Sequence, residues 1–566
     1  MKKYYYLIFI LAITILAYIP AFHAGLLQWD DAPFIINNSY IKNLSFANIK
    51  YIFTNSIEGY HPLSLLTIAI EYYFVGLSPF LYHFNNILLH LINIILLYFI
   101  IVKLTKNYKI SFIVALLFAI NPIHVQTVAQ ASERRGLLMA MFYFISLFYY
   151  INYCIKNNKK AYYLSLLFFI LSLFSNGRAI PLSISIILID YLLNRNILKK
   201  KIIFEKLPFI ALAVIFGIIS IYTQKLTGYG YKPENFTYID YFFIAGYNYI
   251  QYIINLLLPF NLSSGYPYPT KINGLLPSQY YIYILLSISI FILLLYSIKK
   301  KLLKNKLIIF GILFYSINIV LLLRLFSPLT ENIMEDHYSY IPSIGIFLIV
   351  AFIFNSFVKK NQNIKKLIYS FSLVIISFLI VLTYQRNIVW QNTMSLLNNI
   401  LQKQPNRFVP LNNRGYLFLY SDKYTKALTD FNRAIKIKPD YIDPYYGRAR
   451  VYDELGQTKN ALFDYNRFIE SRKEKPNNFI QLSAAYNNRG VINARQRNYK
   501  KAYEDFSNSI RLNPNFCDPL TNQALIYLIY NNTQKTIELC DKAIEINPKY
   551  EEAYNIKIMA IEKKSE

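Results

Sequence analysis

Long apolar blocks separated by short polar loops dominate the first two thirds of the chain. Each block holds about 18 to 22 residues, and about 20 apolar residues in a helix are needed to cross a hydrocarbon core of roughly 30 Å. The blocks therefore predict a bundle of about eleven membrane-spanning helices. We expect these spans near residues 4–22, 83–102, 110–122, 137–154, 161–175, 180–194, 207–223, 280–298, 307–325, 339–357 and 367–384.

A different periodicity begins near residue 408. Small residues recur with steps of 34, 41 and 34, at Ala427, Ala461, Ala502 and Thr536. Four positions later come Phe431, Tyr465, Phe506 and Cys540, and another small residue stands twelve positions before each member of the first set, at Gly415, Ala449, Gly490 and Ala524. This spacing is typical of tetratricopeptide repeats, whose helix pairs bury their apolar faces only against their neighbours.

The two patterns divide an all-α chain into two parts. We expect a polytopic membrane helix bundle over residues 1–387 and an α-solenoid of helix pairs over residues 388–566. Within the solenoid, a half unit at 388–405 precedes four units near 408–441, 442–475, 483–516 and 517–550. The longer step between the second and third units fits an insertion around 471–478.

Basic residues in alternate loops predict the orientation. The loops 1–3, 103–109, 156–160, 195–206, 299–306 and 359–366 together hold 22 Lys and Arg and one acid, Glu205. Because positively charged loops stay in the cytoplasm, we expect the N-terminus inside and, after eleven spans, the repeats on the extracytoplasmic side.

One apolar stretch, near 241–258, does not fit this alternation. If it spanned the membrane, the basic loop 299–306 would lie outside. We therefore expect a helix that lies at, or re-enters from, the outer surface, where its tyrosines suit the membrane interface. The alternative is a twelfth span, which would bring the repeats into the cytoplasm.

Composition and charge agree with a membrane protein. Only 16% of the residues are charged, whereas soluble domains carry about 25%. The net charge of +28 is divided between residues 1–400, with 32 basic and 12 acidic residues, and residues 401–566, with 27 and 19. Most of the excess therefore lies in short loops, which argues against nucleic-acid binding.

Acidic residues gather on the side opposite the basic loops. Ten of the twelve carboxylates in residues 1–400, and all six histidines, fall there. The sharpest cluster is Asp30-Asp31, about eight residues beyond the first expected span. Adjacent carboxylates repel, which raises one pKa unless a cation lies near, so the pair suits a general base or half of a metal site. The alternative is a helix N-cap, since Asp-Ala-Pro reads as a turn that enters a helix.

Several stretches around these residues resemble a known family. They are WDDAPFIINN at 29–38, HPLSLLTIAIEYYFVGLSPFLYHFNNILLHLIN at 61–93, LLFAINPIHVQTVAQASERRGLL at 116–138, IPLSISIILIDYLL at 180–193 and DHYSYIPSIG at 336–345. Together with the repeats behind them, they resemble the transmembrane and tetratricopeptide-repeat, O-mannosyltransferase-like family of the GT-C glycosyltransferase superfamily, and its bacterial relatives.

The resemblance implies an inverting transfer of a sugar, with mannose as one candidate, from a polyprenyl-phosphate donor. The acceptor would be a hydroxyl, such as Ser or Thr of a protein. The family's first outer loop carries an acidic motif that matches Asp30 and Asp31, which makes them the expected catalytic residues. The leaving phosphate would meet cations, and the candidates by position and sign are Arg134, Arg135, Arg178 and His337.

The repeats predict a binding surface for the acceptor or a partner protein. Polar residues on first helices of two units could hold a peptide backbone by amide contacts: Asn412, Asn413, Arg414, Asn487, Asn488 and Arg489. No cofactor is implied beyond the lipid-linked donor, although the carboxylates are compatible with a divalent cation.

The sequence thus leaves two functions open. The first is a membrane glycosyltransferase of the extracytoplasmic face, in a bacterial inner membrane or, alternatively, in the endoplasmic reticulum. The second is a non-catalytic membrane-anchored scaffold that assembles protein partners through its repeats.

Overall fold

The structure is a computed structural model that describes residues 2–226, 236–300, 305–325, 331–473 and 479–565. It forms two compact units, Met1–Asn399 and Ile400–Glu566. The sequence predicted this division after residue 387, whereas the first unit of the structure extends to Asn399. The extension arises because residues in 387–393 bond to the first loop of the membrane unit. Gln391 O accepts a hydrogen bond from Gly25 N at 2.8 Å, and Thr393 Oγ1 accepts one from Gln28 N at 2.9 Å.

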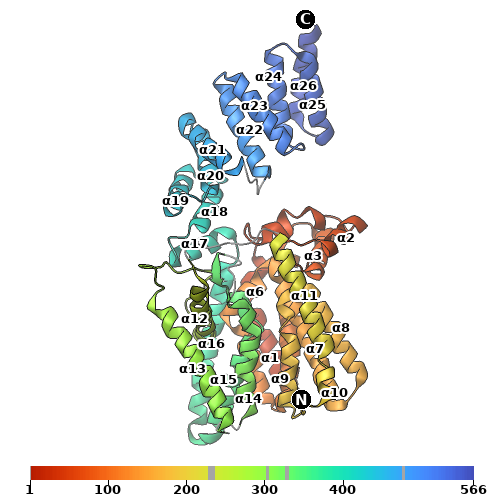
Figure 1. Cartoon of the computed structure of the whole chain (residues 1–566), viewed down its shortest axis with the longest axis vertical. Helices are drawn as coiled ribbons and strands as arrows, with labels where there is room; N and C mark the ends of the chain where they lie inside the picture. The colour runs from red at the N-terminus through yellow and green to blue at the C-terminus, as the bar shows by residue number, and fades with distance from the viewer. Residues whose placement is uncertain (1, 227–235, 301–304, 326–330, 474–478, 566) are drawn as a thin grey trace. The chain divides into compact units, whose positions relative to one another are not determined.

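Helices make up nearly all of the first unit (Figure 1). They are α1 (Lys2–Ala17), α2 (Phe46–Thr54), α3 (Pro62–Val75), α4 (Pro79–Thr105), α5 (Tyr108–Ile120), α6 (Val125–Ala129), α7 (Arg134–Lys156), α8 (Lys159–Ser175), α9 (Leu182–Leu192), α10 (Lys200–Phe204), α11 (Leu207–Leu226), α12 (Tyr238–Leu257), α13 (Ser278–Lys299), α14 (Lys306–Ile319), α15 (Ser343–Lys360) and α16 (Lys365–Val389). The fold class predicted from the sequence is confirmed.

Each of the eleven expected spans overlaps an α-helix, although some run several residues past its end. Among the described residues, six helices are long and apolar enough to cross a membrane, and the bent pair α5 and α6 would make a seventh. Tyr4–Ala17 and Lys306–Leu322 are apolar but shorter. The expected number of eleven spans therefore stays a prediction.

Asparagine residues begin many of these helices because their short side chains accept hydrogen bonds from the first free backbone N–H groups. Asn107 caps α5, Asn158 caps α8 and Asn305 caps α14. Between α14 and α15, glycine allows the backbones to touch: a Cβ atom on Gly345 would lie 2.3 Å from Gly311 O. Small residues are what close packing between membrane helices requires.

Helix α12 contains the stretch that did not fit the loop alternation. Its bonds run along its length to the ends of other elements: Asn248 donates to Ile333 O at 2.8 Å, Tyr252 donates to Glu335 O at 3.0 Å, and Leu256 O accepts from Asn121 at 2.9 Å. In Figure 1, α12 is seen nearly end-on, whereas α13 and α14 are seen from the side. The surface helix and its alternative, a twelfth span, both stay predictions.

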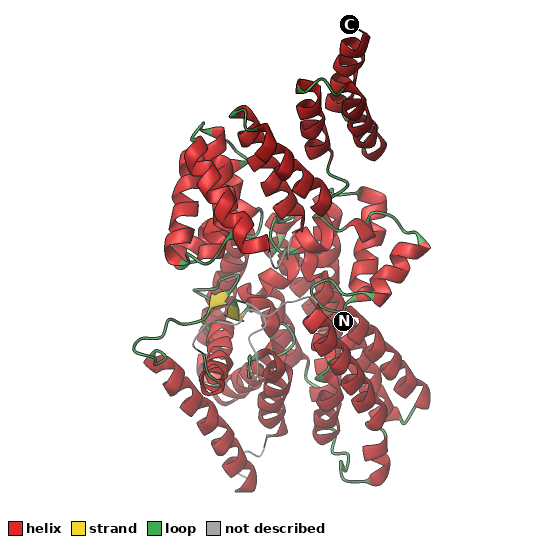
Figure 2. Cartoon of the chain, turned by 45° about the horizontal axis from the view of Figure 1, so that its top comes forward, coloured by secondary structure: helices red, strands yellow, loops and turns green. Residues whose placement is uncertain are grey.

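The described strands form one small antiparallel pair (yellow in Figure 2). They are β1 (Tyr266–Pro267) and β2 (Asn332–Met334), with Tyr266 opposite Met334. The pair fixes the segment that leads into the Asp336-His337-Tyr338 motif.

The second unit consists of stacked helix pairs, as the period of 34 predicts. Its helices are α17 (Thr393–Lys403, shared with the first unit), α18 (Phe408–Leu419), α19 (Tyr424–Ile437), α20 (Asp443–Glu454), α21 (Thr458–Lys473), α22 (Phe479–Arg495), α23 (Tyr499–Leu512), α24 (Cys517–Ile529), α25 (Thr533–Ile546) and α26 (Glu551–Ser565). Gly415 and Gly490 allow the helices of one pair to approach, since a Cβ on either would lie 2.7 Å from a phenylalanine ring.

Candidate functional site

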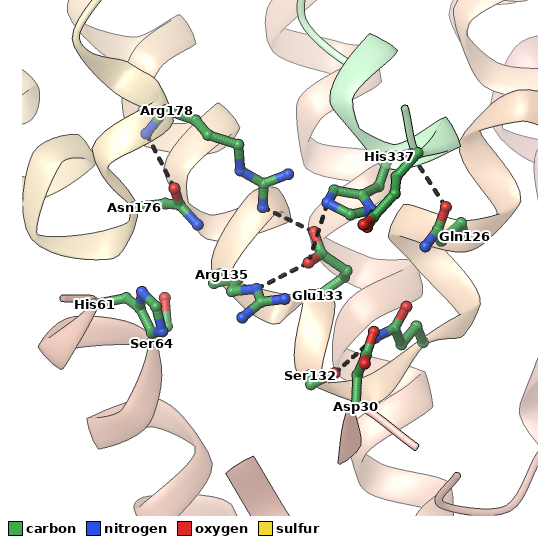
Figure 3. Close-up of polar contacts among 12 residues, drawn as sticks. Asp30, His61, Ser64, Gln126, Ser132, Glu133, Arg135, Asn176, Arg178 and His337 are labelled. Atoms are coloured by element: carbon green, nitrogen blue, oxygen red, sulfur yellow. Dashed lines mark hydrogen bonds and ion pairs between the residues drawn. The ribbon is translucent and has the colours of Figure 1, made fainter. Parts of the chain in front are cut away.

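A buried carboxylate, Glu133, brings together three of the predicted phosphate-binding side chains (Figure 3). Arg135 Nε lies 2.8 Å from Glu133 Oε1, and Arg178 Nη2 lies 2.8 Å from Oε2. His337 Nε2 lies 3.8 Å from Oε1. The Glu133 side chain is fully buried, so three segments far apart in the sequence converge on one acid. The sequence predicted that Glu133 lies on the side opposite the basic loops, but it assigned no role to this residue.

Backbone bonds fix the segments that carry this group. Asn86 of α4 donates to Gln130 O at 2.9 Å, which holds the turn just before Glu133. Asn176 Oδ1 accepts from Arg178 N at 3.0 Å, and Gln126 Oε1 accepts from His337 N at 3.3 Å. Because buried polar groups need partners, these bonds determine where the charged side chains lie.

The ion pair between Glu133 and Arg178 depends on a residue without a side chain. A Cβ atom on Gly136 would lie 2.9 Å from Glu133 Oε2 and 3.1 Å from Arg178 Nη2. Any larger residue would therefore push the two partners apart. Gly136, Arg178 and His337 also line a small recess together with Tyr338.

Asp30 and Asp31 have different surroundings. Asp31 is fully buried, and both its oxygens accept backbone N–H groups, from Leu27 at 2.9 Å and from Ser132 at 2.8 Å. It precedes the helical turn Ala32–Ile36 without a side-chain capping bond, so the N-cap alternative is wrong. Asp30 is partly exposed and accepts from Gln130 Nε2 at 2.9 Å. Asp31 thus ties the first loop to the turn before Glu133, and Asp30 is the better placed candidate for a base.

The surroundings also shift proton affinities. Burial of its carboxyl and, to a smaller extent, the nearby Glu335 carboxylate raise the pKa of Asp30, Arg135 lowers it, and the net result is a pKa of about 8. Burial lowers the pKa of His337 to about 3, so its imidazole is neutral at pH 7. His337 therefore does not supply the positive charge that sequence analysis expected of it.

Arg134 lies apart from this group. Its Nη1 is 3.0 Å from Glu71 Oε1, and it donates to Asn86 Oδ1 at 2.5 Å and to Tyr82 O at 2.9 Å. With 3% of its surface exposed, the guanidinium is enclosed by these partners. This favours a structural role over the predicted contact with phosphate.

A metal site has less support. Over the described ranges of the chain, no group of three or more His, Cys, Asp or Glu side chains is arranged to hold a metal ion. A divalent cation stays a prediction without a ready set of ligands.

In the repeats, two of the predicted peptide-binding residues serve packing. Arg414 makes two bonds with Asp430, at 2.7 and 2.9 Å, within its own unit. Arg489 pairs with Asp505 in the same way, at 3.1 and 2.5 Å. These contacts hold the two helices of a unit together and leave both guanidinium groups engaged.

The asparagines of the same surface differ between units. Asn487 Oδ1 accepts from Asn522 Nδ2 at 3.0 Å, and Asn488 donates to Tyr465 OH at 3.3 Å. Asn412 donates to Asn413 Oδ1 at 3.3 Å, but its own Oδ1 is buried without a hydrogen-bond partner in the described part of the chain. Asn412 lacks the partner that Asn522 provides to Asn487, because the residue at the equivalent position of the next unit is Gly447, which has no side chain.

Comparisons with known proteins agree with this division of the chain. Residues 61–222 match the family described as dolichyl-phosphate-mannose-protein mannosyltransferase. Residues 415–456, 442–475 and 483–516 match tetratricopeptide repeat families.

Two relatives cover most of the chain. The protein O-mannosyl-transferase F38B6.6 of Caenorhabditis elegans is 24% identical over 77% of this chain and 63% of its own length. The protein O-mannosyl-transferase TMTC3 of Homo sapiens is 22% identical over 95% of this chain and 64% of its own length. The chain therefore spans less than two thirds of each of these relatives. Among solved structures, a MamA protein is 20% identical, covering 28% of this chain and 82% of its own, with a TM-score of 0.25.

A mannosyltransferase-family region inside the helix bundle is thus followed by the repeats in one chain. On this evidence the chain is similar, in its helix bundle and in the repeats that follow, to the transmembrane and tetratricopeptide-repeat, O-mannosyltransferase-like family of the GT-C type.

Proposed function

We propose that this protein transfers a sugar, with mannose as the first candidate, from a polyprenyl-phosphate donor to a hydroxyl acceptor at the extracytoplasmic face. The single observation that carries the proposal is the convergence of Arg135, Arg178 and His337 on Glu133. The same turn, through Gln130, holds Asp30. A base candidate and two cations therefore share one site at the end of the bundle opposite the basic loops.

The reaction would use these groups in two roles. Asp30 takes the proton of the acceptor hydroxyl while the hydroxyl oxygen attacks the anomeric carbon from the face opposite the phosphate, which inverts the configuration. The bond between that carbon and the phosphate oxygen breaks, and the electron pair leaves with the lipid phosphate. Arg178 and Arg135 would stabilise the negative charge that develops there.

Glu133 prepares the cations for this task. Two guanidinium groups on one carboxylate leave an excess of positive charge, which favours an anion in the adjoining recess. Because both arginines are already held, little conformational entropy would be lost when the phosphate binds.

The repeats would present the acceptor protein. The orphaned Asn412 Oδ1 supports this proposal, since a buried acceptor without a donor costs free energy that a bound backbone N–H would recover. Asn412 and Asn413 are thus better candidates for this contact than Arg414 or Arg489.

The direct test measures sugar transfer in membranes that contain the full chain, with radiolabelled polyprenyl-phosphate mannose as donor. We expect Asp30→Asn to lower transfer about 100-fold or more, the usual effect of removing a general base. Asp440→Asn, which changes an exposed aspartate of the repeats, is the matched control and should leave transfer unchanged at equal protein amounts.

The rival proposal makes the opposite prediction. If the chain is a scaffold, Asp30→Asn will leave the cellular glycan profile intact, while deletion of the whole chain will disturb it. Full transfer by the Asp30→Asn variant would contradict the catalytic proposal.

A further inference from the structure

His61 directly precedes α3 and is almost fully buried, with 5% of its surface exposed. Its side chain makes no capping bond to the helix. Ser64, three residues later, donates to Ser175 O at 3.0 Å, which fastens the start of α3 to the end of α8. The start of the helix is therefore held without the imidazole of His61.

The ring of Phe34 links His61 to the Glu133 group. The centroids of the Phe34 and His61 rings lie 5.5 Å apart, and the Arg135 guanidinium lies 4.5 Å from the centroid of the same Phe34 ring. Figure 3 shows the imidazole on the Arg135 side of the Glu133 carboxylate. Phe34 belongs to the helical turn that follows the Asp30 loop. The loop with the base candidate, the start of α3 and one cation thus meet around a single aromatic ring.

One ring nitrogen of His61 closes the loop before α3. Nε2 lies 3.0 Å from Ile57 O, and because a carbonyl oxygen only accepts, Nε2 carries the hydrogen and donates it. Burial and the nearby Arg135 charge lower the pKa of His61 to about 3, so the imidazole is neutral at pH 7. The other nitrogen, Nδ1, is therefore unprotonated and has a lone pair that can accept a hydrogen bond.

No donor from the described part of the chain meets this lone pair, since the contact with Ile57 is the hydrogen bond that His61 makes there. Both nitrogens of His83 are closed off from solvent, whereas Nδ1 of His61 is not. Gly59 leaves room beside the ring, because a Cβ atom on it would lie 3.5 Å from Nδ1 and 3.0 Å from Cε1. Buried polar atoms need partners, so an O–H or N–H group of a ligand fits this position.

We propose that His61 Nδ1 accepts a hydrogen bond from a hydroxyl group of the sugar on the lipid-linked donor. This inference rests on the proposed function, because it gives the sugar a contact beside the cations that would hold the donor phosphate. The two contacts differ in chemistry. A phosphate offers acceptor oxygens and suits the arginines, whereas a hydroxyl offers the hydrogen that Nδ1 can accept. A site built to bond a hydroxyl also rejects sugars without it.

Two substitutions of His61 separate binding from structure. Glutamine places its amide nitrogen where Nε2 lies, so His61→Gln keeps the bond to Ile57 O and loses the acceptor at Nδ1. Asparagine places a polar atom where Nδ1 lies, so His61→Asn keeps an acceptor and loses the bond to Ile57 O. The full chain in nanodiscs is titrated with farnesyl phosphate mannose and, for comparison, with farnesyl phosphate.

We expect His61→Gln to weaken the binding of farnesyl phosphate mannose about fivefold, as the loss of one hydrogen bond does. Its thermal midpoint and its binding of farnesyl phosphate should equal those of the parent chain. His61→Asn should keep most of the binding of the mannosylated lipid but have a lower thermal midpoint. His23→Gln, at an exposed position, should match the parent chain in every measurement.

Unchanged binding of farnesyl phosphate mannose by His61→Gln would overturn the inference. An equal loss of binding for both lipids would also overturn it, because His61 would then act on the phosphate or on the fold. If His61→Gln raises only the KM for a threonine peptide in the transfer assay, the hydroxyl belongs to the acceptor and the assignment to the sugar is wrong. If the parent chain binds the mannosylated lipid through His61 but transfers no sugar, the sugar site stands and the proposed reaction fails.

Discussion

Asp30 and Asp31 are neighbours in the sequence, yet their carboxyl groups meet different environments. The sequence identifies the pair as candidate chemistry, but it cannot assign the roles. The backbone amides of Leu27 and Ser132 donate hydrogen bonds to the Asp31 carboxylate. Ser132 lies about a hundred residues away in the chain. Tertiary contacts of this kind leave no local pattern.

Glu133 illustrates the same limit from the other direction. In the sequence it stands beside Arg134 and Arg135, so a reader sees two cations and one acid in a polar loop. The structure separates the two arginines: Arg135 stays with Glu133, and Arg134 joins Glu71. A lone acid directly before an apolar helix was the available signal, because a buried carboxylate near a membrane is costly without partners.

A pH profile should report the state of Asp30. Since a base works only when deprotonated, a raised pKa of about 8 predicts that transfer increases as the pH rises through that value. Glu335→Gln removes a neighbouring negative charge that contributes to the shift, so the rising limb should move to lower pH. The measurement is the initial rate of mannose transfer between pH 6 and about 9.5, a range chosen to bracket the ordinary and raised values.

The pH profiles of the parent chain and of Glu335→Gln are compared in membranes prepared in the same way. A limb that stays in place in Glu335→Gln, or that moves to higher pH, would show that Asp30 is not the titrating group.

Among the elements, the helices at the basic end of the bundle are joined by a buried charge network. Asp190 at the end of α9 accepts from Arg195 Nη1 at 2.8 Å and from Tyr150 OH at 2.9 Å, and it pairs with Lys206. Arg195 also reaches Glu205 at 2.8 Å. Two acidic and two basic side chains thus connect α7, α9, α10 and α11. Their charges balance one another, so the network has no excess charge that would attract a ligand.

This network predicts a change in stability that is separate from catalysis. Asp190→Asn leaves Arg195 and Lys206 with one carboxylate, and removal of one partner from a buried ion pair costs about 3 kcal/mol or more. We expect a lower thermal midpoint in detergent. The turnover of the molecules that remain folded should equal that of the parent chain, because the network lies at the end away from Asp30.

Turnover is therefore scaled to the folded fraction, measured by size-exclusion chromatography. A fall in turnover per folded molecule, with the thermal midpoint unchanged, would place this network in the reaction and contradict the assignment.

The repeat helices show how far periodicity predicts packing. The small residues of the register and the residues four positions later are buried in every unit, with Cys540 in place of an aromatic ring in the last, because steric fit at helix crossings repeats with the sequence. The period also contains a ladder that sequence analysis missed. Arg448 bonds to Asp464 sixteen residues later and to Asn432 sixteen residues earlier, and Arg489 bonds to Asp505 and Asn466. Reading polar residues in the same register as the apolar ones would have found it.

At the scale of the whole molecule, the side of the membrane on which each part lies is a prediction that starts from the charge of the loops. We expect the basic loops on the cytoplasmic side, and whether α12 spans the membrane decides whether the alternation holds as far as the repeats. Its bonds to Asn121, Ile333 and Glu335 tie its length to the segments that carry the candidate site. If α12 lies at one surface, as we expect, it adds no crossing, and the repeats and Asp30 share a side.

Cysteine labelling in intact cells tests that conclusion. Asn460→Cys places a thiol on an exposed surface of the repeats, and Lys300→Cys places one at the end of α13 in the basic loop. An impermeant maleimide should label position 460 in intact cells and position 300 only after permeabilisation. The parent chain supplies the background, because Cys517 and Cys540 are buried and Cys154 is partly so. The reverse pattern would mean that α12 crosses the membrane. It would then put the repeats in the cytoplasm, away from Asp30, and they could not deliver an acceptor to the extracytoplasmic site.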